Sequence, residues 1–308
     1  DDIDLYRQLA GGVTAAQLLH GSANPIGGQS ALVKLRWGRN ADDMRIEGAE
    51  GFIKFALGEN VKRSHWGDGG RFPTTRMGVE QVMYDAFFRA KEYRDEIARA
   101  QAKRASKGGK GDHTGLVSAP RPDLELDAVV GILEGKRHIT CHSYVQSEIA
   151  MLMDVADSMG FTVQTFTHVL EGYKVAQRLK EHGATASTFS DWWAYKMEVG
   201  DAIPHNAALL DRMGVNTCIN SDDAEMARRL NQEAAKAVKY GGATPEAAWR
   251  MVTLNPAKAL RLDARMGSVE VGKDADIVLW SADPLSIDSK VELTFVDGVR
   301  CFDRAEDA

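Results

Sequence analysis

Residues 138–168 read HITCHSYVQSEIAMLMDVADSMGFTVQTFTH, and this stretch decides the fold class. Two short β-rich runs, His138–His142 and Thr162–His168, flank an amphipathic helical segment. A strand, a helix and a second strand at this spacing are typical of two parallel strands joined by a helical crossover. Both runs end in histidine, so the stretch places two imidazoles at neighbouring strand ends.

The same alternation of strands and helices continues on both sides of this stretch. Helical segments separate the β-rich runs; the longest, residues 77–103, carries an apolar stripe at helical spacing. Seven strand–helix units between residues 13 and 220 approach the (β/α)₈ TIM barrel, which takes about 250 residues. The sequence therefore predicts an α/β barrel of the TIM type in which seven units are present and one is missing. The other five runs are Val13–Leu19, Ala31–Leu35, Gly51–Leu57, Ala184–Phe189 and Val215–Asn220.

The last part of the chain has a different pattern. Residues 267–280 and 291–302 alternate like antiparallel strands, with glycines at the turns and no helix between them. A few such strands are marginal alone and need another surface to pack on. We therefore predict a barrel domain over residues 1–255, and a C-terminal helix with part of a small β-sandwich over residues 256–308.

Composition excludes several classes of protein. Lys and Arg number 38 and Asp and Glu number 44, so the net charge is 38 − 44 = −6. A mildly acidic chain is a poor candidate for binding nucleic acid or an anionic membrane, and no apolar run approaches the roughly 18–20 residues of a membrane span. The three cysteines form no CxxC pair. We therefore expect a small-molecule substrate, with neither nucleic acid nor membrane as a partner.

Chemically useful side chains stand at the ends of four predicted strands: Lys54, His142, His168 and Asp222. In a parallel barrel the carboxyl ends of the strands converge on one face, where functional groups lie. Imidazole is the usual nitrogen ligand of Zn²⁺, and a carboxylate acts as ligand or base. A lone histidine at a strand end is more often structural, but two histidines one unit apart, with an aspartate after the last strand, favour a metal site.

Two C-terminal strings carry a family resemblance: Asn255-Pro256-Ala257-Lys258 and residues 267–276, GSVEVGKDAD. With the strand-end residues they make the chain similar to imidazolonepropionase-like members of the amidohydrolase superfamily. The resemblance implies a barrel with a β-sandwich built from both chain ends. It matches the family's strand-4 lysine to Lys54, its strand-5 and strand-6 histidines to His142 and His168, and its strand-8 aspartate to Asp222.

What the resemblance implies about chemistry is hydrolysis of a C–N bond in an amide, cyclic amide or dipeptide-like substrate. A divalent metal, with zinc the expected ion and one or two ions bound, would be held by Lys54, His142, His168 and Asp222. Lys54 would act as a carboxylated lysine. Asp222 would be the general base that takes a proton from the attacking water. Glu59 is an alternative metal ligand to Lys54, because some members of the superfamily use a glutamate there.

The chain departs from the family at its start. The family's first strand ends in His-x-His, which supplies two metal ligands, and this sequence contains no His-x-His. We therefore expect the chain to begin just after that strand, at Asp1, with the second metal site short of its ligands. A barrel lacking a strand exposes two sheet edges, so we also expect association, such as a homo-oligomer. Any signal peptide would lie upstream, and the compartment, cytoplasm or periplasm, stays open.

Residues on loops after the strands are candidates for substrate binding. Loops at a barrel mouth carry specificity, and a charged or aromatic side chain there can meet a substrate. Structural roles are nearly as common for such residues. The candidates are His20, Arg63, His65, Tyr144 and Tyr173.

Two other readings of the function stay open at this point. A deaminase of the same superfamily would use the same attack on an amidine carbon and release ammonia. A catalytically inactive, truncated remnant or interaction module would explain the absence of His-x-His. The four intact strand-end residues oppose the inactive reading, because a decaying site loses its ligands at random.

Overall fold

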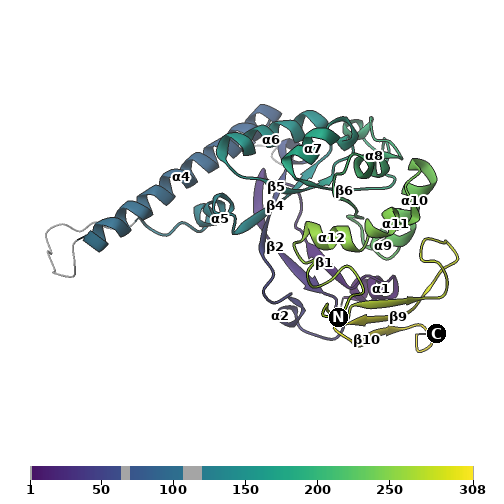
Figure 1. The fold of residues 1–308 in the computed structure, drawn as a ribbon. Helices are drawn as coiled ribbons and strands as arrows, with labels where there is room; N and C mark the ends of the chain where they lie inside the picture. The colour runs from purple at the N-terminus through teal and green to yellow at the C-terminus, as the bar shows by residue number, and fades with distance from the viewer. Residues whose placement is uncertain (1, 64–69, 107–119, 308) are drawn as a thin grey trace.

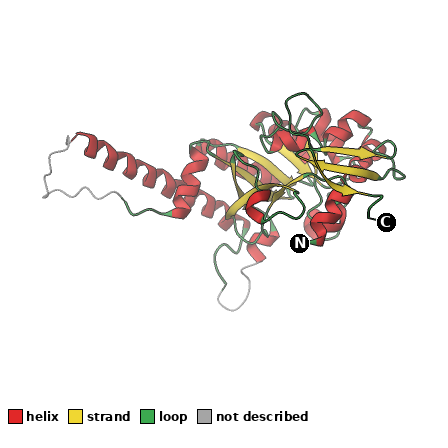
Figure 2. Cartoon of the chain, turned by 90° about the horizontal axis from the view of Figure 1, so that it is seen from below, coloured by secondary structure: helices red, strands yellow, loops and turns green. Residues whose placement is uncertain are grey.

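The computed structural model describes residues 2–63, 70–106 and 120–307. In this part of the chain a seven-stranded sheet curls into a half-barrel, and a separate three-stranded sheet lies beside the N-terminal helix α1 (Ile3–Ala10) (Figure 1). Helices cover the convex side of the large sheet (Figure 2). The predicted α/β class with a small additional β unit is confirmed.

Each of the seven predicted β-rich runs overlaps a strand of the large sheet, although β2 begins at Ile26, before the predicted run Ala31–Leu35. The sheet order follows the chain order without exception. The strands are β1 (Ala15–Leu18), β2 (Ile26–Lys34), β3 (Gly51–Ala56), β4 (Arg137–Ser143), β5 (Val163–His168), β6 (Thr185–Thr188) and β7 (Thr217–Ile219).

The strand directions correct the prediction at the start of the sheet. Strands β3 to β7 are parallel, as expected for strand–helix units. Strand β2, however, runs antiparallel to both β1 and β3, so it is not a barrel unit of the usual kind. The reason lies in the connection, because only residues 19–25 separate β1 from β2. A parallel crossover needs about a dozen residues or more, whereas a short loop can only reverse the chain.

Helices alternate with the parallel strands and supply the outer layer. Between sheet and helices lies the largest apolar cluster, in which Phe55, Ile139 and Phe166 from the strands meet Leu152 and Leu179 from the helices. The remaining helices are α2 (Ala41–Met44), α3 (Glu59–Arg63), α4 (Arg76–Ser106), α5 (Leu124–Leu133), α6 (Gln146–Met159), η1 (Gly172–Lys174), α7 (Ala176–His182), η2 (Met197–Val199), α8 (Asn206–Arg212), α9 (Ala224–Ala227), α10 (Leu230–Gly241), α11 (Pro245–Arg250) and α12 (Leu254–Ala259).

The long predicted helix is confirmed as α4, which projects away from the body of the molecule (Figure 1). Thr75 caps it, because its Oγ1 accepts a hydrogen bond from the Gly78 N–H at 3.0 Å. The Gly- and Pro-containing, aperiodic residues 103–122 predict a loop after this helix, most of which (107–119) lies outside the described residues. The apolar pattern of residues 224–240 favours a single helix, but α9 and α10 divide this segment at Arg228 and Arg229.

The C-terminal strands form the antiparallel order β10–β9–β8, with bounds β8 (Ile277–Trp280), β9 (Val291–Val296) and β10 (Val299–Asp303). The predicted alternation over residues 267–280 is strand only from Ile277; the preceding residues form turns. The small sheet packs on α1, where the Thr294 hydroxyl donates to the Leu9 carbonyl at 2.8 Å. The division at residue 255 stays a prediction, since α12 spans it.

One further negative finding concerns membranes. No helix within the described ranges is both long enough and apolar enough to cross a bilayer.

Candidate functional site

Lys54 and His142 lie on the same face of neighbouring strands. On β3, Ile53 and Phe55 point outward into the helix-covered core, so Lys54 points to the concave face. On β4, Ile139 and Cys141 do the same, which turns His142 inward. Ala56 pairs with His142 in the strand register, so Lys54 lies one inward-facing position deeper than the histidine. Both side chains are nearly fully buried.

His168 reaches the same place by a different route. By simple alternation on β5 it would share the outward face of Phe166, which lies in the core. The backbone of His168 instead takes φ = +69°, and that of the next residue, Val169, takes φ = +38°. These left-handed conformations break the alternation and bring the His168 ring within 4.6 Å of the His142 ring, centroid to centroid. Strain of this kind is concentrated at functional sites.

Asp222 follows β7 and also has a left-handed backbone, with φ = +50°. Its Oδ2 lies 3.9 Å from Nε2 of His168, and its side chain is 62% exposed at the open side of the mouth. The structure therefore brings His142, His168 and Asp222 to one place at the carboxyl ends of the parallel strands. Lys54 points to the same mouth, but its Nζ donates to the His20 carbonyl at 2.6 Å.

Two ring nitrogens at this place have no hydrogen-bond partner. Nδ1 of His142 and Nδ1 of His168 are both buried and make no hydrogen bond of good geometry, although the Asn220 side chain lies close enough to His168 to raise its pKa. A buried polar atom without a partner costs free energy, so native proteins rarely keep one without a purpose. Nε2 of His142 lies 3.4 Å from the amide nitrogen of Asn60.

The charges of the site shift the pKa values of its members. Burial, and then the charges of His168, Lys54 and Lys196, hold the pKa of His142 well below its usual value. Burial and the charge of Lys54 lower the pKa of His168 to about 3. Both imidazoles are therefore neutral at pH 7 and keep a lone pair for a ligand.

Lys54 and Asp222 are shifted in the direction of their neutral forms. Burial lowers the pKa of Lys54, although the charge of Asp222 opposes the shift. Partial burial raises the pKa of Asp222, although the charge of Lys54 opposes it. A lysine that loses its proton more easily can be carboxylated, and a carboxylate with a raised pKa is a stronger base.

An aromatic wall, made of Tyr144, Phe189, Trp192 and Tyr195, covers the two histidines. The ring of Phe189 stacks on that of His168 at 4.6 Å, and Trp192 stacks on Phe189 at 5.0 Å. Tyr144 packs edge-on against His142 at 4.6 Å. The Tyr144 and Tyr195 hydroxyls lie 3.1 Å apart. The wall keeps one side of the site apolar, as is typical of small-molecule sites.

Most of this wall comes from the segment after β6, residues 189–199, which sequence reasoning had only partly recognised. The sequence by itself marks Trp192 as a possible lining residue, because it follows a predicted strand, but it indicates no such role for Phe189, Lys196 or Glu198. The available signal was the dense aromatic string Trp192-Trp193-Ala194-Tyr195 directly after a strand end. Nothing in the sequence marked Lys196, because it belongs to no motif and no periodic pattern.

The other predicted substrate-binding residues are placed as follows. Tyr144 lies in the site. Both ring nitrogens of His20 face backbone groups, Nδ1 the Gly21 carbonyl at 2.8 Å and Nε2 the Gly28 N–H at 2.6 Å. The Tyr173 hydroxyl donates to the Asp201 carbonyl at 3.1 Å.

The remaining candidates follow β3. Glu59 begins α3, and its backbone N–H donates to Oε1 of Glu198 at 2.8 Å. Arg63 ends α3, and His65 lies outside the described residues. Whether any of these residues contacts a substrate or a metal stays a prediction.

A second group of possible metal ligands lies at the carboxyl end of β2, beside Lys34. Among the His, Cys, Asp and Glu residues of the described ranges, Asp274, Asp276 and Asp297 form a three-member group whose ligand atoms lie within 4.8 Å of one another. This group already holds a cation, because the fully buried Lys34 places its Nζ 2.8 Å from Asp274 and 3.0 Å from Asp276 and also contacts Asp297. We therefore assign it a structural role, joining β2 to the C-terminal sheet.

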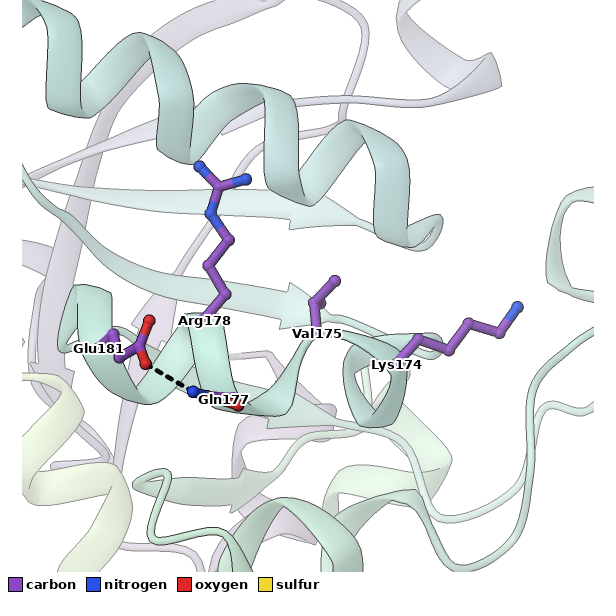
Figure 3. A pocket seen from close by; sticks show the side chains of 5 residues that line it. All are labelled: Lys174, Val175, Gln177, Arg178 and Glu181. Carbon is purple, nitrogen blue, oxygen red and sulfur yellow. Dashed lines mark hydrogen bonds between the residues drawn. The ribbon is translucent and has the colours of Figure 1, made fainter.

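A surface hollow of about 330 Å³ lies along α7 (Figure 3). Its polar side chains are satisfied by one another or by neighbours. Gln177 donates to Glu181 at 2.8 Å, and Arg178 and Lys174 pair with Asp154 and Asp201. The hollow is built from a helix of the outer layer, so it is separate from the strand ends that carry the histidines.

Comparisons with known proteins identify relatives of the chain. The Amidohydrolase family profile matches residues 39–301. The chain is similar to the amidohydrolase tasK of Hapsidospora irregularis, with 31% identity over 308 residues, 96% of this chain and 31% of that protein. It is also similar to the imidazolonepropionase of Thermoplasma volcanium, with 28% identity over 155 residues, half of this chain and 36% of that protein. The chain thus spans about a third of the length of these two curated relatives.

A solved structure extends the likeness to the fold. The crystal structure of an amidohydrolase from Thermotoga maritima MSB8 superposes with a TM-score of 0.86 at 32% sequence identity. The match covers 98% of this chain and 75% of that chain.

Proposed function

The chain belongs to the amidohydrolase family, and from this premise we propose that it is a metal-dependent hydrolase of amide-like C–N bonds in a small molecule. The proposed metal ligands are Lys54, His142, His168 and Asp222, with zinc as the expected ion. Because the chain spans about a third of tasK, the proposal concerns this chain and not the activity of that longer protein.

The observation that carries the proposal is the pair of unpaired imidazole nitrogens. Nδ1 of His142 and Nδ1 of His168 are buried without a hydrogen-bond partner, and the two rings lie 4.6 Å apart. Both rings are held neutral, so each offers a lone pair, and neutral imidazole is the form that binds a metal. Two neutral imidazoles and a carboxylate at one place are donor types that suit a divalent ion such as zinc.

When bound, such an ion would lower the pKa of a water toward about 7 and polarise the substrate carbonyl. The protein's own groups supply the proton transfers. Asp222 stands 3.9 Å from His168 on the open side of the site, where its carboxylate can take a proton from water and return it to the leaving nitrogen. Its raised pKa suits both transfers.

Lys54 would contribute as a carbamate. Burial lowers the pKa of its amine, and a neutral amine can add CO₂ and release a proton. In this structure its Nζ donates to the His20 carbonyl, so carboxylation would exchange that hydrogen bond for an oxygen ligand. Glu59 remains the alternative ligand, since it begins the helix that follows β3.

Metal analysis and hydrolysis assays test the proposal together. We expect about one or two equivalents of zinc or another divalent ion in the purified chain, and their loss in the H142A/H168A double variant. A control is H138A, which removes a histidine at the other end of β4, where it pairs with Glu50. Wild-type protein should hydrolyse members of a panel of N-acyl amino acids, dipeptides and cyclic amides.

The D222N variant separates binding from chemistry. It should retain metal through the histidines but lose hydrolysis by at least about a hundredfold, which is typical of removing a general base. Ammonia release without amide cleavage would instead identify a deaminase. Equal metal content in wild type and H142A/H168A, with no hydrolysis of any panel member, would refute the proposal.

A further inference from the structure

Lys196 is the cation of the segment that covers the histidines. Its Nζ lies 4.3 Å from the centre of the Tyr144 ring and 5.6 Å from that of Tyr195. The Tyr144 ring in turn packs against His142 at 4.6 Å and stacks on His168 at 5.5 Å. A single aromatic ring therefore separates the Lys196 ammonium from the two proposed metal ligands.

The ammonium is held in this position by a fixed carboxylate. Oε2 of Glu198 lies 3.0 Å from the Lys196 Nζ, and the Glu198 side chain is fully buried. Its other oxygen, Oε1, accepts the Glu59 N–H at 2.8 Å. Gly58 leaves the necessary room, because a Cβ at that position would lie 2.4 Å from Oε1. Glu198 thus links the segment after β6 to the turn after β3.

The segment does not need Lys196 in order to stay in place. The Glu198–Glu59 hydrogen bond, the Tyr144–Tyr195 contact and the stacking of Phe189 on His168 already fasten it. An ammonium has three N–H donors, and one ion pair with a flanking ring does not use all three. The Lys196 side chain is 27% exposed, so a ligand at the mouth can reach it.

We propose that Lys196 recognises a carboxylate on the substrate, next to the C–N bond that is cleaved. The inference rests on the proposed function and narrows it to a substrate class: acidic amides such as N-acyl amino acids and dipeptides with a free carboxyl terminus. The carboxylate receives the N–H donor of Lys196 that Glu198 leaves unused. The neighbouring Tyr144 ring shields the contact from water, which strengthens it.

The electrostatics of the site agree with this placement. The charge of Lys196 reaches both His142 and His168, where it helps to lower their pKa values. An anion bound at Lys196 would therefore lie within the field of the same histidines. The other ammonium of the site, Lys54, is buried deeper and bonded to the His20 carbonyl, which leaves Lys196 as the better placed cation for an incoming substrate.

The test compares each N-acetyl amino acid in a panel with its own carboxamide, which removes the charge and little else. Binding is measured by calorimetry and hydrolysis by release of acetate. For at least one pair, the wild type should bind and turn over the acid better than the carboxamide. The K196M variant should weaken binding of the acid, or raise its KM, by about 10–100-fold, with the carboxamide unchanged. K196R should retain the preference.

The matched control is K174M. Lys174 also stands over a tyrosine, at 5.8 Å from the Tyr173 ring, and pairs with Glu171 and Asp201, but it lines the hollow along α7. K174M should keep the preference for the acid, and both methionine variants should unfold within a few degrees of the wild type. A lysine that is merely structural would lower stability in K196M and leave the ratio between acid and carboxamide unchanged.

The outcomes separate this inference from the proposed function. Hydrolysis without a preference for acids, or a preference that survives in K196M, overturns the inference and leaves the proposed function standing. Binding of acids that depends on Lys196, without hydrolysis of any amide, supports the inference and counts against the proposed function. A wild type that binds no member of the panel overturns the inference.

Discussion

Replacing Lys34 by methionine is expected to destabilise the folded protein by about 3–5 kcal/mol, the usual cost of breaking a buried ion pair from one side. The Lys34 side chain is fully buried, and its ammonium contacts Asp274, Asp276 and Asp297. These residues connect β2 with the C-terminal sheet across more than 200 positions of the chain. Methionine keeps the apolar stem and removes only the charge.

The size of this loss depends on which cations remain near the three carboxylates when Lys34 is replaced. Asp274 retains Arg265 at 3.2 Å and Asp297 retains Arg36 at 2.7 Å. Asp276, whose side chain is 5% exposed, keeps no cation within 4 Å in the described part of the chain. Because the group's oxygens lie within 4.8 Å of one another, each pair of charges repels by about 3 kcal/mol at an effective dielectric constant of about 20. The repulsion of the unpaired Asp276 from its two neighbours, partly offset by Arg265 and Arg36, is of the order of the expected loss.

Urea unfolding at pH 7, followed by tryptophan fluorescence, measures the effect. The control variant K290M removes an exposed lysine near the same sheet and should change the unfolding free energy by less than about 0.5 kcal/mol. The double variant K34M/D276N should recover part of the loss, because it removes one repelling charge. A loss below about 1 kcal/mol in K34M, or no recovery in the double variant, would refute the reasoning.

Lowering the pH should reduce the difference in unfolding free energy between wild type and K34M. Burial by itself would raise the pKa of Asp297, but hydrogen bonds from Lys34 and Arg36 outweigh it and hold this pKa below its usual value. The folded state therefore binds fewer protons than the unfolded chain, so this contribution is present above the unfolded pKa of about 4. It is lost as the pH falls further, through the folded pKa.

Two further predictions concern single side chains. Nε2 of His182 accepts the Val163 N–H at 3.0 Å, and burial lowers the pKa of this histidine. Its contribution to the free energy of unfolding is therefore complete above a pH of about 6.5, the unfolded pKa. Below that pH the contribution falls by up to about 1.4 kcal/mol per pH unit. In H182Q the amide oxygen can accept the same hydrogen bond, and the loss between pH 7 and 5 in urea titrations should be smaller; equal losses would contradict this. Gly58→Ala should cost about 1–3 kcal/mol more than Gly48→Ala, because both glycines have positive φ but only the Cβ at Gly58 would meet a neighbour, Glu198. Equal losses of Tm would show that Glu198 moves freely.

Much of the architecture could be predicted from local patterns. The β-rich runs mark the strands because strands buried between helices need apolar, β-branched residues, and each of the seven runs overlaps a strand. The reversed direction of β2 was missed, although the short loop of residues 19–25 was a readable signal. The break at Arg228 and Arg229 was not readable, because residues on both sides continue a helical pattern.

Some residues of the candidate site could likewise be predicted from the sequence, and others could not. Lys54 and His142 were predictable because alternation along a strand assigns a side chain to a face, and neighbouring core residues settle which face is inward. His168 was placed at a strand end for the right reason, but its orientation depends on a left-handed backbone that alternation cannot predict. The approach of Asp222 to His168 also depends on a left-handed backbone, at Asp222 itself.

By itself, then, the sequence determined the strand–helix order, the C-terminal sheet and the identity of the strand-end residues, because periodicity and turn chemistry act over a few neighbouring positions. Only the tertiary structure decided which of those side chains meet. It also brought Lys196 over Tyr144, and Lys34 into three aspartates more than 200 residues away. Contacts of this kind depend on how distant segments pack and share charge in a buried space, and no local pattern encodes that packing.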